Sequence, residues 1–329
     1  MDVERWTLNV SPVQLTEIPA PDFDLAMTLD SGQVFHWEKA GNGFVGTIGQ
    51  YAIYAEQDNV LKVRFGATPK PARETRMLPG IAAHYFGLDH PLTEICASFP
   101  DDPAMNAARD FCRGLRIIRQ PKWECLATFI CSSMKQVAHI RQISLALRKR
   151  FGEPQKIDNH LVRTFPPAQR IARASQKQLR ECALGYRAKN LRATAQLISS
   201  GRCHLDAWSA LSDAQLREQL CALPGVGPKI ANCVMLFAYE RLRAFPVDVW
   251  IERVLKRYYF PRRKKMTAQR LREFSEGYFG EHGGYAQQYL FHHARLTSRT
   301  TAGSRDSSTA LRSARNDKGE GCADEQKPR

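Results

Sequence analysis

A lysine and an aspartate at a fixed separation are the residues of this 329-residue chain that could most readily do chemistry together. The segment LPGVGPKIANC spans 223–233, and its lysine, Lys229, follows a proline suited to the first turn of a helix. A helix amino terminus disfavours positive charge, so Lys229 is either a neutral, nucleophilic amine or an ordinary solvated lysine. Asp248 comes nineteen residues later and precedes a helical pattern. It could act as the N-cap of that helix, as a carboxylate beside the amine, or as both.

The residues before the lysine predict a helix–hairpin–helix. Gly225 and Gly227 permit positive φ and allow another backbone to approach closely. The free N–H groups of the hairpin and of the following helix could then bind a phosphate, although an ordinary interhelical turn has the same glycine pattern. Cys233 lies four residues after Lys229, which places both side chains on one helical face.

The rest of the chain supplies the elements that must position these residues. Residues 24–66 are rich in Phe, Val, Ile and Tyr and are broken by Gly-Asn-Gly and Gln-Asp-Asn, which predicts an antiparallel sheet built from hairpins. From about residue 91 to 296 the apolar positions recur with helical period. Ser212 with Gln215 predicts a capping box at the start of the helix that precedes the hairpin.

This pattern predicts an α+β fold, with a sheet domain followed by a mostly helical body. The carboxy-terminal tail has no aromatic residue and too little apolar surface to order itself. The expected units are an amino-terminal antiparallel β-sheet domain (1–115), a helical body (116–296) whose helix–hairpin–helix covers about 213–241, and a disordered tail (297–329).

Composition narrows the classes of partner. A formal net charge of +15 favours a polyanion such as a nucleic acid. No run of eighteen apolar residues occurs, and the start resembles neither a secretory signal nor a transit peptide, so we expect an intracellular protein that does not span a membrane. The nine cysteines include no Cys-x-x-Cys pair, which argues against a zinc ribbon, an iron–sulfur cluster and a disulfide framework.

Several segments in register resemble one family. Leu-Pro-Gly-Val-Gly-x-Lys followed by Pro-Val-Asp is similar to the helix–hairpin–helix DNA glycosylase superfamily, and within it to the 8-oxoguanine DNA glycosylases. The supporting segments are SGQVFHW (31–37), LRIIRQPKWECLATFICSS (115–133), LGYRAKN (184–190) and GYAQQYLF (284–291). The resemblance runs from about residue 24 to 293. It implies a TBP-like sheet domain, a monomer without metal or cofactor, and duplex DNA containing an oxidised purine as partner.

The resemblance also implies the catalytic roles. Lys229 attacks C1′ of the damaged nucleoside, displaces the base and forms a Schiff base that leads to strand cleavage at the abasic site. Asp248 stabilises the positive charge that develops on the sugar.

Base recognition is implied at four positions. The carbonyl of Gly32 accepts the N7–H that 8-oxoguanine has and guanine lacks. Cys233 and Phe291 are the two walls that sandwich the flipped base, and Gln287, four residues before Phe291, reads its Watson–Crick edge.

The remaining implied residues contact DNA. Tyr186 is the wedge that fills the gap in the stack, and Arg187 donates to the unpaired opposite base. The further DNA-binding positions are His139, Gly225, Val226 and Gly227.

Two departures look like the bacterial branch, which implies a cytoplasmic, nucleoid-associated enzyme. Animal members have an asparagine run and then an arginine after Cys-Ser-Ser; here Met134, Lys135, Gln136 and His139 stand at those positions. Trp250 replaces a histidine two residues after the aspartate. The first departure predicts relaxed selectivity for the base opposite the lesion.

Two alternatives remain. A glycosylase of the same superfamily that acts on alkylated bases typically lacks the lysine, so Lys229 counts against that activity. A non-enzymatic helix–hairpin–helix DNA-binding module would need neither Lys229 nor Asp248, nor the pair of Gln287 and Phe291.

Overall fold

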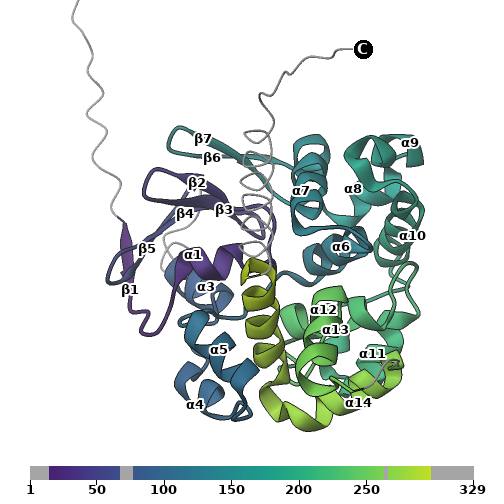
Figure 1. Ribbon diagram of the computed structural model, residues 1–329. Coiled ribbons are helices and arrows are strands. Elements are labelled where there is room, and N and C mark those ends of the chain that lie inside the picture. Colours follow the sequence, from purple (N-terminus) through teal and green to yellow (C-terminus); the bar gives the residue numbers. More distant parts are fainter. Residues whose placement is uncertain (1–14, 67–76, 263–265, 298–329) are drawn as a thin grey trace, which may run out of the picture.

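The computed structural model describes residues 15–66, 77–262 and 266–297 (Figure 1). The amino-terminal sheet has the strand order β1-β5-β4-β3-β2, and every neighbouring pair is antiparallel. Its strands are β1 (Thr16–Ile18), β2 (Glu38–Ala40), β3 (Gly43–Ile48), β4 (Tyr51–Gln57) and β5 (Leu61–Phe65). The two predicted hairpins are confirmed, because Ala40 pairs with Gly43 and Gln57 with Leu61 across the short turns.

One part of the predicted strand region is a helix. Asp24 caps α1 (Leu25–Asp30) by accepting a hydrogen bond from the Met27 N–H at 2.8 Å, and Leu25 and Leu29 turn a buried face inward. The capping carboxylate and this helical spacing outweigh the strand propensity of the neighbouring residues. The α1 helix and α3 (Leu78–Tyr85) lie beside the sheet (Figure 1), and residues from both helices belong to the same buried cluster as Ile53 and Leu61.

The second part of the chain is mostly helical, as predicted. Its helices are α4 (Leu92–Ala97), α5 (Pro103–Phe111), α6 (Lys122–Ser132), α7 (Val137–Phe151), α8 (Ala168–Arg173), α9 (Gln176–Leu179), α10 (Arg187–Ser199), α11 (Asp213–Cys221), α12 (Pro228–Tyr239), α13 (Val249–Val254), α14 (Ala268–Tyr278) and the helix 283–297. The capping box of α11 is confirmed, since the Ser212 hydroxyl accepts from the Gln215 N–H and the Gln215 side chain accepts from the Ser212 N–H. No helix in the described ranges is long and apolar enough to cross a membrane.

The helical body also contains a hairpin that the sequence patterns did not predict. Strands β6 (Pro154–Ile157) and β7 (His160–Arg163) pair with each other and pack against β4 and β3. Ile157 shares a buried cluster with Ala40, Val45 and Ala52 of the sheet. This hairpin therefore extends the helical body over the sheet domain.

Two helices form the centre of the helical body. Every residue of α6 from Glu124 to Ser132 is buried, and α6 packs against α12, which is buried along most of its length. The helix 283–297 lies between α1 and the pair α12 and α13 (Figure 1). It belongs to the same apolar core as α6 and α12, so it can place its side chains beside the start of α12.

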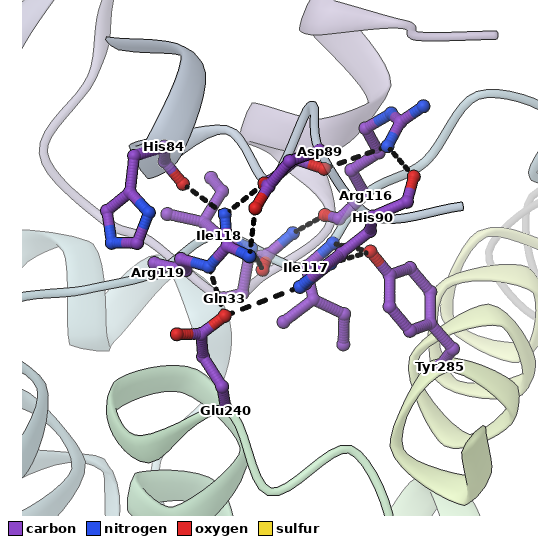
Figure 2. A network of polar contacts seen from close by, with 11 residues as sticks. Gln33, His84, Asp89, His90, Arg116, Ile117, Ile118, Arg119, Glu240 and Tyr285 are labelled. Carbon is purple, nitrogen blue, oxygen red and sulfur yellow. Dashed lines mark hydrogen bonds and ion pairs between the residues drawn. The ribbon is translucent and has the colours of Figure 1, made fainter. Parts of the chain in front are cut away.

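A polar network ties these helices to the sheet domain (Figure 2). Arg119 donates to the carboxylates of Asp89, at 2.9 Å between Nη2 and Oδ2, and of Glu240, which ends α12 in a left-handed conformation. His90 lies between Glu240 and Tyr285, with its Nε2 3.4 Å from Glu240 Oε1 and its Nδ1 2.7 Å from the Tyr285 hydroxyl. Burial and then Arg119 lower the pKa of His90. The carboxyl end of α12 and the start of the helix 283–297 thus share one anchor.

Candidate active site

The hairpin before Lys229 packs tightly against α10. Gly225 has a φ of +83°, and a Cβ at this position would lie 2.7 Å from Cβ of Asn190. The Thr194 hydroxyl donates to the Pro224 carbonyl at 3.0 Å. A side chain at position 225 would therefore both strain the backbone and displace α10, which explains the glycine.

The helix that follows begins with free N–H groups. Gly227 precedes Pro228 as an extended N-cap, and no side chain caps α12. The N–H groups of the first turn have no acceptor within the helix, and the helix dipole adds positive potential there. Gly225 is exposed, whereas the Val226 side chain is buried in the core. The hairpin can thus present backbone donors to a phosphate while Val226 anchors it.

Lys229 is half-buried near an aromatic stack. Its Nζ lies 5.6 Å from the ring centroid of Phe129, which stacks on Phe237 at 5.5 Å with an interplanar angle of 7°. Phe129 comes from α6, and its ring restricts the directions that the lysine side chain can take. The sequence patterns did not single out Phe129, because an apolar residue in a buried helix reads as core.

Cys233 lies one turn after Lys229, and its thiol is buried. Burial raises the pKa of Cys233 to about 11, although the nearby Lys229 charge opposes the rise. The thiol is therefore neutral at physiological pH and is a poor nucleophile. A buried, neutral thiol is compatible with the predicted role of Cys233 as an apolar wall.

Asp248 has the N-cap role predicted from its sequence position, while its role as a carboxylate beside the amine stays a prediction. Its Oδ1 accepts a hydrogen bond from the Ile251 N–H at 2.8 Å, which caps α13. Burial raises the pKa of Asp248, while the Ile251 N–H and the charge of Lys229 oppose the rise. Lys229, in the first turn of α12, and Asp248, the N-cap of α13, thus both stand at helix amino termini.

The predicted base-recognition residues come together from opposite ends of the chain. Gly32 has a φ of +85°, and a Cβ there would lie only 3.1 Å from Cε1 of Phe291. No described residue donates a hydrogen bond to the Gly32 carbonyl. Gln287 lies one turn before Phe291 and is 4% exposed, yet its Oε1 has no partner among the described residues. A buried amide oxygen without a partner is costly and is typical of a site that binds a ligand.

Gln33 fixes the segment that contains Gly32. Its amide donates to the carbonyl of Arg116 at 2.8 Å and accepts from the Ile118 N–H at 2.8 Å. Both partners lie in the segment that leads into α6. The position of Gly32 therefore depends on contacts about 85 residues away in the chain as well as on the local hydrogen bonds of Gln33 to Ser31 and Thr28.

The predicted wedge, Tyr186, and the predicted donor to the opposite base, Arg187, form one unit. The Tyr186 side chain is 60% exposed, and the Arg187 guanidinium lies 4.4 Å from its ring centroid. Arg187 is buried and donates through Nε to the Ser133 carbonyl at 2.8 Å and through Nη1 to the Leu184 carbonyl at 3.2 Å. Arg187 thus braces Tyr186 and the end of α6. Its donation to an unpaired base stays a prediction.

The loop between α6 and α7 presents an unusual side chain beside this unit. Met134 has a φ of +52° and is 92% exposed, and the predicted DNA contact His139 is exposed near the start of α7. A methionine in the left-handed region is uncommon, because its Cβ is strained there. An exposed apolar side chain here provides no hydrogen bonds for an orphaned base. In the described ranges, no group of three or more His, Cys, Asp or Glu residues could hold a metal ion.

Comparisons with known proteins identify the family of the chain. Residues 16–126 match the family model of the 8-oxoguanine DNA glycosylase N-terminal domain, and residues 127–277 match that of the HhH-GPD superfamily of base excision DNA repair proteins. An N-glycosylase/DNA lyase of Arabidopsis thaliana is 31% identical over 301 residues, which are 85% of this chain and 79% of the relative. The N-glycosylase/DNA lyase of Saccharomyces cerevisiae is 32% identical over 262 residues, covering 71% and 68%.

Solved structures extend the likeness to the fold. The 8-oxoguanine glycosylase/lyase of Clostridium acetobutylicum, in complex with double-stranded DNA containing cytosine opposite 8-oxoguanine, superposes with a TM-score of 0.78 at 27% identity, over 87% of this chain and 98% of that one. A 3-methyladenine DNA glycosylase from Archaeoglobus fulgidus shares the fold with a TM-score of 0.72 at 18% identity, over 86% of this chain and 98% of that one. Taken with the two family models, these relatives place the chain in the 8-oxoguanine DNA glycosylase family of the HhH-GPD superfamily.

Proposed function

We propose that this protein is a bifunctional DNA glycosylase of base excision repair, which excises 8-oxoguanine from duplex DNA and then cleaves the strand at the abasic site. The observation that carries this proposal is the placement of Lys229 at the start of α12, near Asp248 and on the same face as the buried Cys233. The uncapped backbone N–H groups at the start of α12 and the +15 charge of the chain support binding to a duplex.

The proposed chemistry uses the amine of Lys229 as the nucleophile and the carboxylate of Asp248 as its electrostatic partner. The lone pair of Lys229 Nζ forms a bond to C1′ while the bond from C1′ to the base breaks, and the departing base takes the electron pair and then a proton. Asp248 stabilises the positive charge on the sugar in this transition state. Ring opening yields a Schiff base, and removal of a proton from C2′ expels the 3′ phosphate by β-elimination. Water then hydrolyses the imine and releases the lysine.

Base recognition rests on a difference of one hydrogen. In 8-oxoguanine N7 carries a hydrogen, whereas in guanine N7 presents a lone pair that a carbonyl oxygen repels. The free carbonyl of Gly32 suits the lesion and disfavours guanine. The unpartnered amide oxygen of Gln287 supports its role at the Watson–Crick edge. Cys233 and Phe291 are the proposed walls of the pocket, because both are buried and apolar.

A trapping experiment tests this function. The full-length protein is incubated with duplexes carrying 8-oxoguanine, guanine or an alkylated purine opposite cytosine, in the presence of borohydride. We expect a covalent protein–DNA adduct and strand cleavage only with 8-oxoguanine. Release of the alkylated base without an adduct would favour the alkylation-repair activity instead. Binding without base release from any duplex would favour a non-enzymatic module.

The resemblance to bacterial members supports two further proposals. The enzyme acts as a monomer, and it works on chromosomal DNA at the nucleoid of a bacterial cell. The sedimentation of the free protein and of its complex with one duplex checks the first proposal, because a monomer gives a complex with one protein chain.

We predict relaxed selectivity for the opposite base. Met134 cannot donate or accept a hydrogen bond that distinguishes cytosine, so single-turnover excision of 8-oxoguanine should differ by less than about tenfold among the four opposite bases. The variant Met134→Asn suits a φ of +52° and supplies an amide, so it should shift the preference toward cytosine. A preference for cytosine above about a hundredfold in the unaltered protein would contradict the prediction.

A further inference from the structure

Arg295 has no part in the chemistry described so far, although it lies in line with the base-recognition residues. It follows Phe291 by four residues and Gln287 by eight on the helix 283–297, so the three side chains share one face. Arg295 is 3% exposed, which is rare for an arginine outside a functional or structural network. Its position therefore calls for partners inside the protein.

These partners come from the end of α1 and from the helix 283–297 itself. The Arg295 Nη2 donates to the backbone carbonyl of Asp30 and to Nδ1 of His292 at 3.2 Å. The guanidinium carbon lies 5.8 Å from the ring centroid of Phe291. A Cβ on Gly32 would lie 3.6 Å from Arg295 Nη1. The guanidinium therefore lies close to both Gly32 and the Phe291 ring.

His292 is able to accept this hydrogen bond. Burial lowers the pKa of His292 to about 4, and the charge of Arg295 acts in the same direction. The ring is therefore neutral at physiological pH, and its Nδ1 can carry a lone pair toward Arg295. The direction of the guanidinium is fixed by an acceptor on its own helix.

The segment that Arg295 holds needs external support. Gly32 follows α1 in a left-handed conformation, without a strand or helix to fix its carbonyl. Two residues of the helix 283–297 hold the adjacent carbonyls: Arg295 binds that of Asp30, and the Gln288 amide donates to that of Ser31 at 2.9 Å. These contacts leave the next carbonyl, that of Gly32, for a ligand.

We propose that Arg295 is a positioning residue for base recognition, which holds the Gly32 carbonyl and the Phe291 ring at the separation that an 8-oxoguanine base requires. This inference rests on the proposed function. A displacement of about 1 Å in a site of this kind costs roughly a hundredfold in rate at most. The contribution is made through Gly32 and Phe291, so it concerns the step that reads the base and not the chemistry of Lys229.

Two reactions of the same enzyme allow base recognition and the chemistry of Lys229 to be measured separately. Excision of 8-oxoguanine needs the base pocket, whereas strand cleavage at a preformed abasic site needs Lys229 but no base. Arg295→Met replaces the side chain by an unbranched apolar one of similar stem and removes its donors. We expect single-turnover excision to fall about tenfold while cleavage at abasic sites stays within about twofold. Arg295→Lys retains a donor for the Asp30 carbonyl, so its excision rate should lie between those of the unaltered protein and Arg295→Met.

A control separates the backbone contact from the ion pair. The Asp30 carboxylate is 75% exposed and lies 3.5 Å from Arg295 Nη2. Asp30→Asn keeps the backbone carbonyl, so excision should stay within about twofold of the unaltered protein, as expected for an exposed pair. Equal losses of excision and abasic cleavage in Arg295→Met would assign Arg295 to general stability and overturn the proposal, as would unchanged excision. If the unaltered protein excises no 8-oxoguanine, the proposed function itself fails.

Discussion

Replacing Lys229 by glutamine is expected to abolish both base excision and borohydride trapping. Glutamine has a similar length and can still lie over Phe129, but its amide nitrogen is not a nucleophile and forms no Schiff base. The expected loss is at least about a thousandfold in single-turnover excision, since no other nucleophile is in place. The measurement is single-turnover excision of 8-oxoguanine opposite cytosine, with trapping followed on the same duplex.

Affinity for the duplex separates this loss from a defect in binding or folding. The N–H groups of the hairpin and of the first turn of α12 are backbone groups, so Lys229→Gln should retain affinity within a few-fold, as expected for the loss of about one charge contact. A matched control is Lys122→Gln, which removes a lysine whose ion pair with the exposed Asp206 lies at 2.8 Å. Excision by that control should be unchanged. Residual trapping by Lys229→Gln would show that a different amine is the nucleophile.

Replacing Asp248 by asparagine should slow excision by about a hundredfold, because an amide cannot stabilise the positive charge on the sugar. Asparagine remains a good N-cap, so the hydrogen bond to the Ile251 N–H should persist. The variant therefore isolates the charge of Asp248 from its structural role. Single-turnover rates, together with the affinity for the duplex, measure the effect. An unchanged rate would remove Asp248 from the mechanism.

The Asp248→Asn variant is expected to be at least as stable at neutral pH as the unaltered protein. Burial raises the pKa of Asp248, so the folded state binds its proton more tightly than the unfolded chain does. The ionised carboxylate therefore lowers the free energy of unfolding as the pH rises above its unfolded pKa. Asp248→Asn carries no such charge, so its melting temperature at neutral pH should equal or exceed that of the unaltered protein. A clear decrease would show that the carboxylate is needed for more than the cap.

The pH profile provides a second check on the same residue. Because the pKa of Asp248 is raised, its ionised form should be lost on acidification at a higher pH than for an ordinary aspartate. Excision by the unaltered protein should fall over that acid range. The asparagine variant should lack this acid limb, since it has no carboxyl group to protonate. A shared acid limb would assign the titration to another group.

Local sequence patterns were sufficient to predict the features whose geometry is set within a few residues. Gly225, Pro228 and the Ser212–Gln215 capping box each depend on backbone geometry within one turn, and the structure has them as predicted. The prediction for Gly227 is wrong, because this residue has an extended φ of −100° and no atom lies within 4 Å of the place of a Cβ. Asp24 shows the limit of such patterns. Its capping bond to Met27 starts a helix in a stretch whose composition favours a strand.

The base pocket depends on contacts that no local pattern contains. Gly32 meets Phe291 from the other end of the described chain, and without the family resemblance Phe291 reads as core and Gly32 as a turn glycine. Arg187 illustrates the same limit, because its bond to the Ser133 carbonyl spans 54 residues. The roles inferred for Phe129 and Arg295 depend on contacts between α6, α12 and the helix 283–297, which form only in the folded chain.

The anchor at Glu240 has a mechanical consequence. Lys229 and Glu240 are eleven residues apart on α12, or about 16 Å along the axis of a straight helix. Extruding a base from a duplex loads the protein with a few kcal/mol of unstacking and unpairing energy. The ion pairs of Arg119 and the hydrogen bond of His90 to Tyr285 hold the far ends of α12 and of the helix 283–297 against the sheet domain. This anchor therefore opposes a change in the spacing between α12 and the helix 283–297.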